Sequence, residues 1–105
     1  MARTPIHPGE ILREELAEMG VNAAELARQI NVPNNRLYQI LGGRRAITAD
    51  TALRLGKWFG MSAEFWLNLQ KSFELRSAAR TIAKEIDAIP TRGNSPAGSQ
   101  IDGAA

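Results

Sequence analysis

The most informative segment of the chain is residues 22–45, NAAELARQINVPNNRLYQILGGRR. Asn22 can cap a helix, and Glu25 three residues later completes the capping-box pattern that marks a helix start. The sequence Asn-Val-Pro at 31–33 then interrupts the helix, because asparagine tolerates a left-handed backbone and proline cannot continue a preceding helix. A second helix follows over about residues 34–41 and stops at two glycines. The segment therefore predicts two short helices joined by a tight turn.

The second of these helices has one apolar face and one polar face. At 100° per residue, with Leu37 at the centre of the buried side, Ile40 and Leu41 lie within about 60° of that centre. The remaining side chains carry amides, a guanidinium and a phenol, and none is acidic: Asn34, Asn35, Arg36, Tyr38 and Gln39. Asparagine and glutamine can pair with the edge of adenine, and arginine with that of guanine. We expect this face to read bases in the major groove as part of a helix-turn-helix; the alternative is an ordinary solvated face.

Two neighbouring features offer contacts to the DNA backbone. Arg44 and Arg45 follow the two glycines and are the best candidates for phosphate contacts beside the groove. A capped helix start, such as the one at Asn22, presents free backbone N–H groups that also suit a phosphate. Most capped helices bind no anion, so Asn22 is a candidate only because of its place in this two-helix unit.

The charge distribution favours the same interpretation. The net charge of the chain is +2, but residues 28–57 carry six basic side chains and one acidic side chain, a net charge of +5. No acidic residue occurs between Leu26 and Asp50. Basic character concentrated on one segment is expected of contact with nucleic acid, although a solvated basic face gives the same pattern.

The chain divides into an arm, a helical domain and a tail. Residues 1–7 are predicted to form an extended arm, because their prolines disfavour helix in the residues that precede them. Pro8 suits the first turn of a helix, where a missing N–H costs nothing. The helix-turn-helix domain with a C-terminal helix extension is expected to span residues 8–89. Residues 90–105 are small and polar and are predicted to be a disordered tail.

Two further helices are predicted after the arginine loop. One spans about residues 49–59 with Thr48 as its cap, and the other begins after Ser62. Both tryptophans and all three phenylalanines lie between residues 58 and 73. Such an aromatic cluster usually forms a core, and the part that a small domain cannot bury is expected to form a dimer interface. The candidates for that interface are Phe65, Trp66, Leu69 and Phe73.

An apolar stripe with heptad-like spacing continues towards the C-terminus. It comprises Leu75, Ala79, Ile82, Ile86 and Ile89. The stripe covers about two heptads, which is too short for a stable coiled coil. It has to rest either on the body of the domain or on a partner chain. Dimerisation is therefore expected through the fifth helix, this stripe or the arm, and we favour the fifth helix.

Composition excludes several function classes. The 105 residues suit one small domain, and the absence of cysteine excludes disulfides and thiolate metal sites. His7 is the only histidine, so neither a metal site, a cofactor nor a catalytic triad is expected, and His7 is predicted to be structural or incidental. No apolar run approaches the roughly 20 residues of a membrane span, and the N-terminus does not look like a secretion signal. We therefore expect a cytoplasmic protein that is not an enzyme.

Four segments of the chain together resemble a known family. They are IHPGEIL at 6–12, VPNNRLYQIL at 32–41, RRAITADTALRL at 44–55 and FWLNLQ at 65–70. The two-helix unit with its arginine loop resembles XRE/Cro-type helix-turn-helix regulators, and the flanking segments are similar to the HigA/VapI group of addiction-module antidotes. The resemblance covers about residues 5–89.

The resemblance implies a five-helix, all-α, lambda-repressor-like domain that binds operator DNA as a homodimer. It also implies that the protein represses its own operon and neutralises a RelE-like toxin that cleaves mRNA on the ribosome. By position, Asn22 would meet phosphate, the polar face of 34–39 would enter the groove, and Arg44 and Arg45 would flank it. The chain departs from the family at Pro33, where many XRE proteins carry a serine or threonine cap. The alternatives are a stand-alone XRE-type repressor without a toxin, and an interaction module that does not bind DNA.

Overall fold

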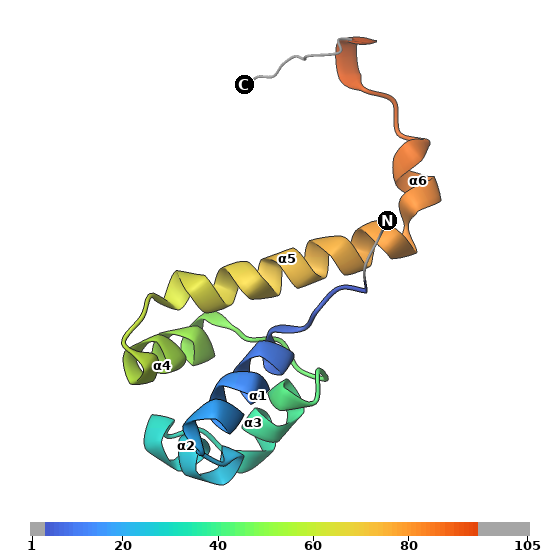
Figure 1. Ribbon diagram of the computed structural model, residues 1–105. Helices are drawn as coiled ribbons and strands as arrows, with labels where there is room; N and C mark the ends of the chain where they lie inside the picture. Colours follow the sequence, from blue (N-terminus) through green and yellow to red (C-terminus); the bar gives the residue numbers. More distant parts are fainter. Residues whose placement is uncertain (1–3, 95–105) are drawn as a thin grey trace.

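The computed structural model describes residues 4–94, and within them the chain forms α-helices, one short 3-10 helix and no strand (Figure 1). The elements are α1 (Pro8–Met19), α2 (Ala23–Ile30), α3 (Asn34–Leu41), α4 (Ala49–Phe59), α5 (Ala63–Thr81), α6 (Ala83–Asp87) and the 3-10 helix η1 (Arg92–Asn94). The prediction of an all-α helix-turn-helix fold is confirmed. Residues 1–3 of the predicted arm and 95–105 of the predicted tail lie outside the described residues. None of the helices between residues 4 and 94 is long and apolar enough to span a membrane.

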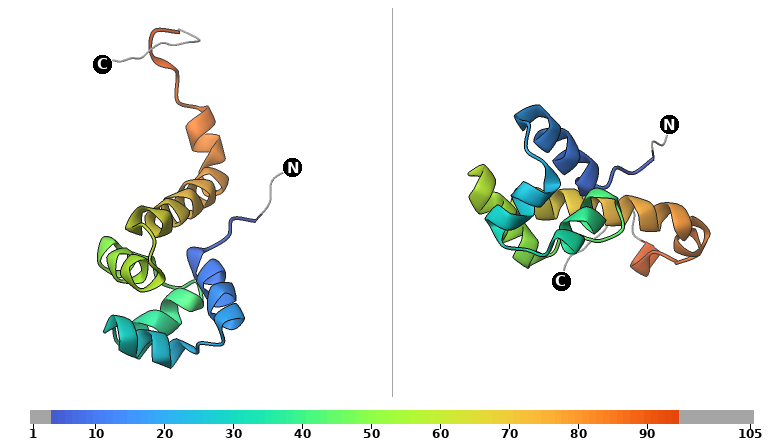
Figure 2. Two further views of the ribbon diagram at one scale, coloured as in Figure 1. Left: turned by 60° about the vertical axis from the view of Figure 1, so that its left-hand side comes forward. Right: turned by 90° about the horizontal axis from the view of Figure 1, so that it is seen from below.

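The first four helices form a compact body, and α5 runs past it. α2 packs on α3, α1 packs on both α3 and α5, and α4 lies along α5. Figures 1 and 2 show the C-terminal part of α5 and the short α6 extending away from that body. The arrangement leaves the α2–turn–α3 unit at the end of the molecule opposite α6, where a large partner can reach it.

The core draws apolar side chains from all five longer helices. Its members include Leu12 and Leu16 of α1, Leu26 and Ile30 of α2, Leu37 and Ile40 of α3, Leu55 of α4 and Trp66 of α5. This corrects the sequence-based prediction for Trp66, which we placed at a dimer interface. Trp66 has 0% of its surface exposed and its ring centroid lies 5.4 Å from that of Phe59, so it belongs to the core of the single chain.

The helix ends follow local sequence signals. The Asn22 side chain accepts a hydrogen bond from the Glu25 backbone N–H (2.8 Å) and so caps α2. Asn31 ends that helix with a left-handed backbone, φ 61°. Ser62 caps α5 by accepting from the Glu64 N–H (2.9 Å). Thr48 is the N-cap residue of α4, as predicted, but its side chain makes no hydrogen bond to the first turn of that helix.

His7 begins the first helix, a role that the sequence analysis missed. Its Nδ1 accepts a hydrogen bond from the Gly9 N–H (2.8 Å), which makes it the N-cap of α1. The histidine is buried, and its ring meets that of Phe73 on α5 edge-to-face at 4.8 Å. A side chain at Gly9 would collide with the Ile40 carbonyl oxygen, because the backbones of α1 and α3 approach each other closely there. His7 therefore fixes the end of the arm to both α1 and α5.

The C-terminal extension is interrupted and lies free of the body. α5 continues through Phe73 as predicted, but it ends at Ile82, which leaves the helical conformation (φ −116°, ψ 30°) before α6 begins. The apolar residues of the stripe, Leu75, Ile82, Ile86 and Ile89, are all exposed. The stripe therefore does not rest on the body of the domain. Of the two supports expected from the sequence, only a partner chain remains.

Candidate nucleic-acid interface

The polar face of α3 is presented to solvent much as its periodicity predicts. Leu37 and Ile40 anchor the helix in the core with no exposed surface. On the other side Asn34 and Asn35 are exposed, Tyr38 is 51% exposed and Gln39 is half-buried. These side chains supply amide and phenol groups that can donate and accept hydrogen bonds, which base edges in a major groove require.

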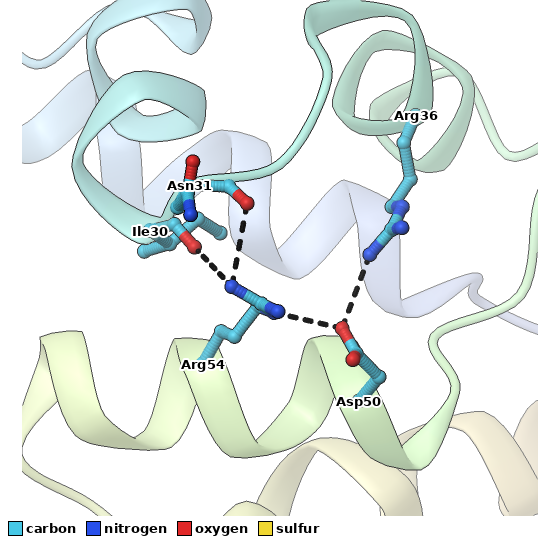
Figure 3. A network of polar contacts seen from close by, with 5 residues as sticks. All are labelled: Ile30, Asn31, Arg36, Asp50 and Arg54. Carbon is cyan, nitrogen blue, oxygen red and sulfur yellow. Dashed lines mark hydrogen bonds and ion pairs between the residues drawn. The ribbon is translucent and has the colours of Figure 1, made fainter.

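Arg36 has a partner that the sequence analysis did not identify. Its Nη1 lies 3.1 Å from Oδ1 of Asp50 in the first turn of α4, and the same oxygen accepts from Nε of Arg54 at 2.8 Å (Figure 3). Arg54 also donates from Nη1 to the carbonyl oxygens of Ile30 (2.9 Å) and Asn31 (3.3 Å). A continuous polar network thus joins the C-terminal end of α2 to α4 and α3. The hydrogen bond from Arg54 is the main reason why the pKa of Asp50 lies below its ordinary value.

Arg44 and Arg45 project from the loop that follows α3, and both are exposed. The loop is held by the Arg44 N–H donating to the Gln39 carbonyl (2.8 Å) and by Gly43 with φ 76°. At its far end the buried Gln70 of α5 accepts from the Ile47 N–H (2.9 Å). Its backbone is therefore fixed while the two guanidiniums remain free to reach a ligand.

A surface depression connects these predicted elements. It is lined by Arg36, Arg45, Ala46, Thr48, Asp50 and Thr51, and so lies between α3 and the start of α4. The structure thus brings Arg36 and Arg45 to one concave patch. The side-chain oxygen of Asn22 already accepts a hydrogen bond from the Glu25 N–H. Only the other polar groups at this helix start are therefore available to contact a phosphate.

Sequence reasoning missed Asp50 and Arg54 because their roles depend on how α4 packs against the other helices. From the sequence alone, Asp50 is only a favourable charge in the first turn of a helix. Arg36 and Asp50 are 14 residues apart, a spacing that predicts no contact within one helix or turn. The i,i+4 pair of Asp50 and Arg54 was the one signal in the sequence. Between residues 4 and 94, no cluster of three or more histidine or acidic side chains could hold a metal ion.

The chain is similar to antitoxins and helix-turn-helix regulators of known sequence or structure. No family model matches it. It is 51% identical over 74 residues to virulence-associated protein I of Dichelobacter nodosus, an alignment covering 70% of this chain and 68% of that protein. A HigA-family addiction module antidote from Coxiella burnetii superposes with a TM-score of 0.82 at 49% identity, covering 85% of this chain and 98% of that one. Pseudomonas aeruginosa antitoxin HigA, solved with the higBA promoter, has a TM-score of 0.81 at 42% identity, with the same coverage of both chains.

Proposed function

Because this chain belongs to the HigA family of helix-turn-helix antitoxins, we propose that it is the antitoxin of a type II toxin–antitoxin module. It binds operator DNA as a homodimer, represses its own operon, and neutralises a RelE-like toxin that cleaves mRNA. It acts in the cytoplasm, where both the operator and the toxin's substrate are found. The relatives supply the antitoxin assignment, while the DNA-binding mechanism is argued from the residues of this chain.

The single observation that carries the DNA-binding proposal is the exposed, acid-free face of α3 beside two exposed arginines. Asn34, Asn35 and Tyr38 are solvent-accessible on a helix that Leu37 and Ile40, both fully buried, anchor in the core. Arg44 and Arg45 are exposed in the loop that follows α3, within a segment, residues 28–57, whose net charge is +5. We propose that α3 enters the major groove and that the two arginines contact the flanking phosphates.

A dimer follows from the requirements of specificity. One recognition helix reads too few base pairs to define a unique site, and a twofold dimer doubles the number of bases that are read. Such a dimer would place its two α3 helices about one turn of DNA apart, on the order of 34 Å. We therefore expect a palindromic operator upstream of the gene.

The DNA-binding part is tested by titrating the full chain with a duplex of its own upstream region and with a scrambled duplex of equal length. We expect markedly tighter binding to the upstream duplex at physiological salt, and a protection footprint with twofold symmetry. Equal affinity for both duplexes at every salt concentration would reject sequence-specific binding and would favour an interaction module that does not bind DNA.

The antitoxin part is tested by co-expression with the adjacent gene, scoring growth and co-purification. We expect the neighbouring protein to arrest growth alone and this chain to restore it. The matched control is the Asn35→Ala/Gln39→Ala variant, which should lose repression of the operon and still restore growth. If the neighbouring protein does not inhibit growth and operator binding persists, the protein is instead a stand-alone repressor.

A further inference from the structure

Asp50 is an unexpected charge at the surface proposed to meet DNA. It is the only carboxylate between residues 26 and 63. It lies in the first turn of α4 and lines the same depression as Arg36 and Arg45. A carboxylate in this place repels phosphate and lowers affinity for DNA of every sequence. The contacts that Asp50 makes should therefore provide an advantage that offsets this loss of affinity.

Asp50 holds Arg36 in one position, and it is itself held. Its Oδ1 accepts both from Arg36 Nη1 (3.1 Å) and from Arg54 Nε (2.8 Å). The other end of the Arg54 guanidinium is fixed to the carbonyl oxygens of Ile30 and Asn31, at the end of α2. Figure 3 shows Asp50 between the two guanidiniums, with Arg36 reaching it from α3. The guanidinium of Arg36 is thus oriented by a chain of contacts that ends on backbone, not on another mobile side chain.

These ion pairs are too exposed to serve mainly as structural links. The exposed fractions of the side chains are 30% for Arg36, 38% for Arg54 and 56% for Asp50. Pairs in contact with this much water contribute little to the stability of a fold. Exposure to water does not remove their effect on geometry, because a tethered arginine still presents its remaining N–H groups in a defined direction.

We propose that Asp50 is a positioning residue for DNA selectivity, which it achieves by tethering Arg36 beside the recognition face of α3. The inference rests on the DNA-binding function proposed above. The tether keeps Arg36 from binding phosphates in arbitrary positions, and in this way it weakens binding to DNA that α3 does not recognise. Selectivity arises here by penalising the wrong ligand as well as by favouring the right one.

The test is the ratio of dissociation constants for scrambled and operator duplexes, measured for the full chain and for Asp50→Asn at two salt concentrations. We expect Asp50→Asn to bind scrambled DNA more tightly and operator DNA no better, so that the ratio falls by roughly fivefold or more. The control is Asp87→Asn, which removes an equal charge from α6, far from α3, and should leave the ratio unchanged. Asp50→Ser serves as a second variant at the same position.

The tether itself is tested in a double-mutant cycle with Arg36→Ala. In the Arg36→Ala background, the change of Asp50 to Asn should no longer alter the ratio. An equal fold-change of Asp50→Asn on both duplexes, or an undiminished effect without Arg36, would overturn the proposal, because a structural or purely electrostatic role predicts those results. A wild-type chain with no preference for the operator rejects the proposed function and this inference together. A wild-type preference that Asp50→Asn and Asp50→Ser both retain rejects the inference alone.

Discussion

His7 connects three parts of the molecule through one imidazole ring. Its Nδ1 caps α1, its ring packs on Phe73 of α5, and its side chain lies beneath Gly43 of the arginine loop. Burial lowers the pKa of His7, and the Arg45 backbone and the Glu10 carboxylate oppose that change less strongly. The cap also requires an unprotonated Nδ1, because this atom accepts the Gly9 N–H. The folded state therefore favours the neutral ring.

This environment predicts a loss of stability in mild acid. The unfolded chain binds a proton near the ordinary histidine pKa of 6.5, whereas the folded chain binds it only at lower pH. The stabilisation is thus complete above pH 6.5 and is lost as pH falls through the lowered folded pKa. We expect the melting temperature of the wild type to fall between about pH 7 and pH 5. His7→Asn, which keeps a capping oxygen but does not titrate there, should show a flatter profile.

Other titrating groups act in a different pH window. Hydrogen bonds from Arg54 and from Ser62 lower the pKa values of Asp50 and Glu64 below their ordinary 3.8 and 4.5. Their contributions are present above those values and are lost only as pH falls below them. Identical profiles for the wild type and His7→Asn between about pH 7 and pH 5 would therefore show that His7 is not the source of the loss.

Two classes of DNA contact on the proposed surface should differ in their response to sequence and to salt. We expect Asn35→Ala to weaken operator binding by about 1–3 kcal/mol and to relax base preference, because it removes a base-reading amide.

Arg44→Ala should weaken binding to every sequence and reduce the slope of log K against log salt by roughly one unit. Titrations at several salt concentrations measure both. Equal losses for Asn35→Ala on operator and scrambled DNA, or an unchanged slope for Arg44→Ala, would contradict these roles.

At the scale of elements, sequence signals predict a helix well when the signal and its effect lie within one turn. The cap at Asn22, the left-handed Asn31 and the buried Leu37 all act on their immediate neighbours, and the structure confirms them. The break at Ile82 was not predicted, because the apolar spacing continues through it. The partner of Arg36 was not predicted either, because Asp50 reaches it only through the packing of α4. The exposed side of the candidate site was thus predictable from periodicity, and its electrostatic support was not.

The cap of α2 provides a test of one element by itself. Asn22→Ala removes the acceptor of the Glu25 N–H (2.8 Å) and should destabilise the fold by about 1 kcal/mol. Asn22→Ser keeps a capping oxygen and should retain most of that stability. Urea unfolding of both variants measures the difference. A loss as large in Asn22→Ser as in Asn22→Ala would mean that the asparagine acts through another contact.

At the scale of the whole molecule, α5 and the segment that follows it carry two apolar surfaces that the single chain does not cover. One flank borders a groove lined by the apolar side chains of Ile6, Ile11, Leu69 and Phe73 together with Thr4, Ser72 and Arg76. Phe65, 41% exposed, lies on that side of α5 by helical periodicity. The other surface is the stripe from Leu75 to Ile89. Both are candidates for the contact of the proposed dimer, and the groove includes two of the interface residues predicted from sequence.

Matched substitutions on the same helix separate these two surfaces. Phe65→Ser should raise the dimer dissociation constant by roughly tenfold or more, because a central aromatic contact is commonly worth over 1 kcal/mol. Leu75→Ser removes a side chain that is 64% exposed, and should leave the dimer intact if the groove flank forms the contact. Sedimentation over a range of concentrations measures both, with melting curves confirming that each variant folds. A shift to monomer in Leu75→Ser alone would assign the dimer to the C-terminal stripe.

A variant that is monomeric should also lose affinity for an operator with two half-sites far more than for a single half-site, because only the operator with two half-sites needs two linked α3 helices.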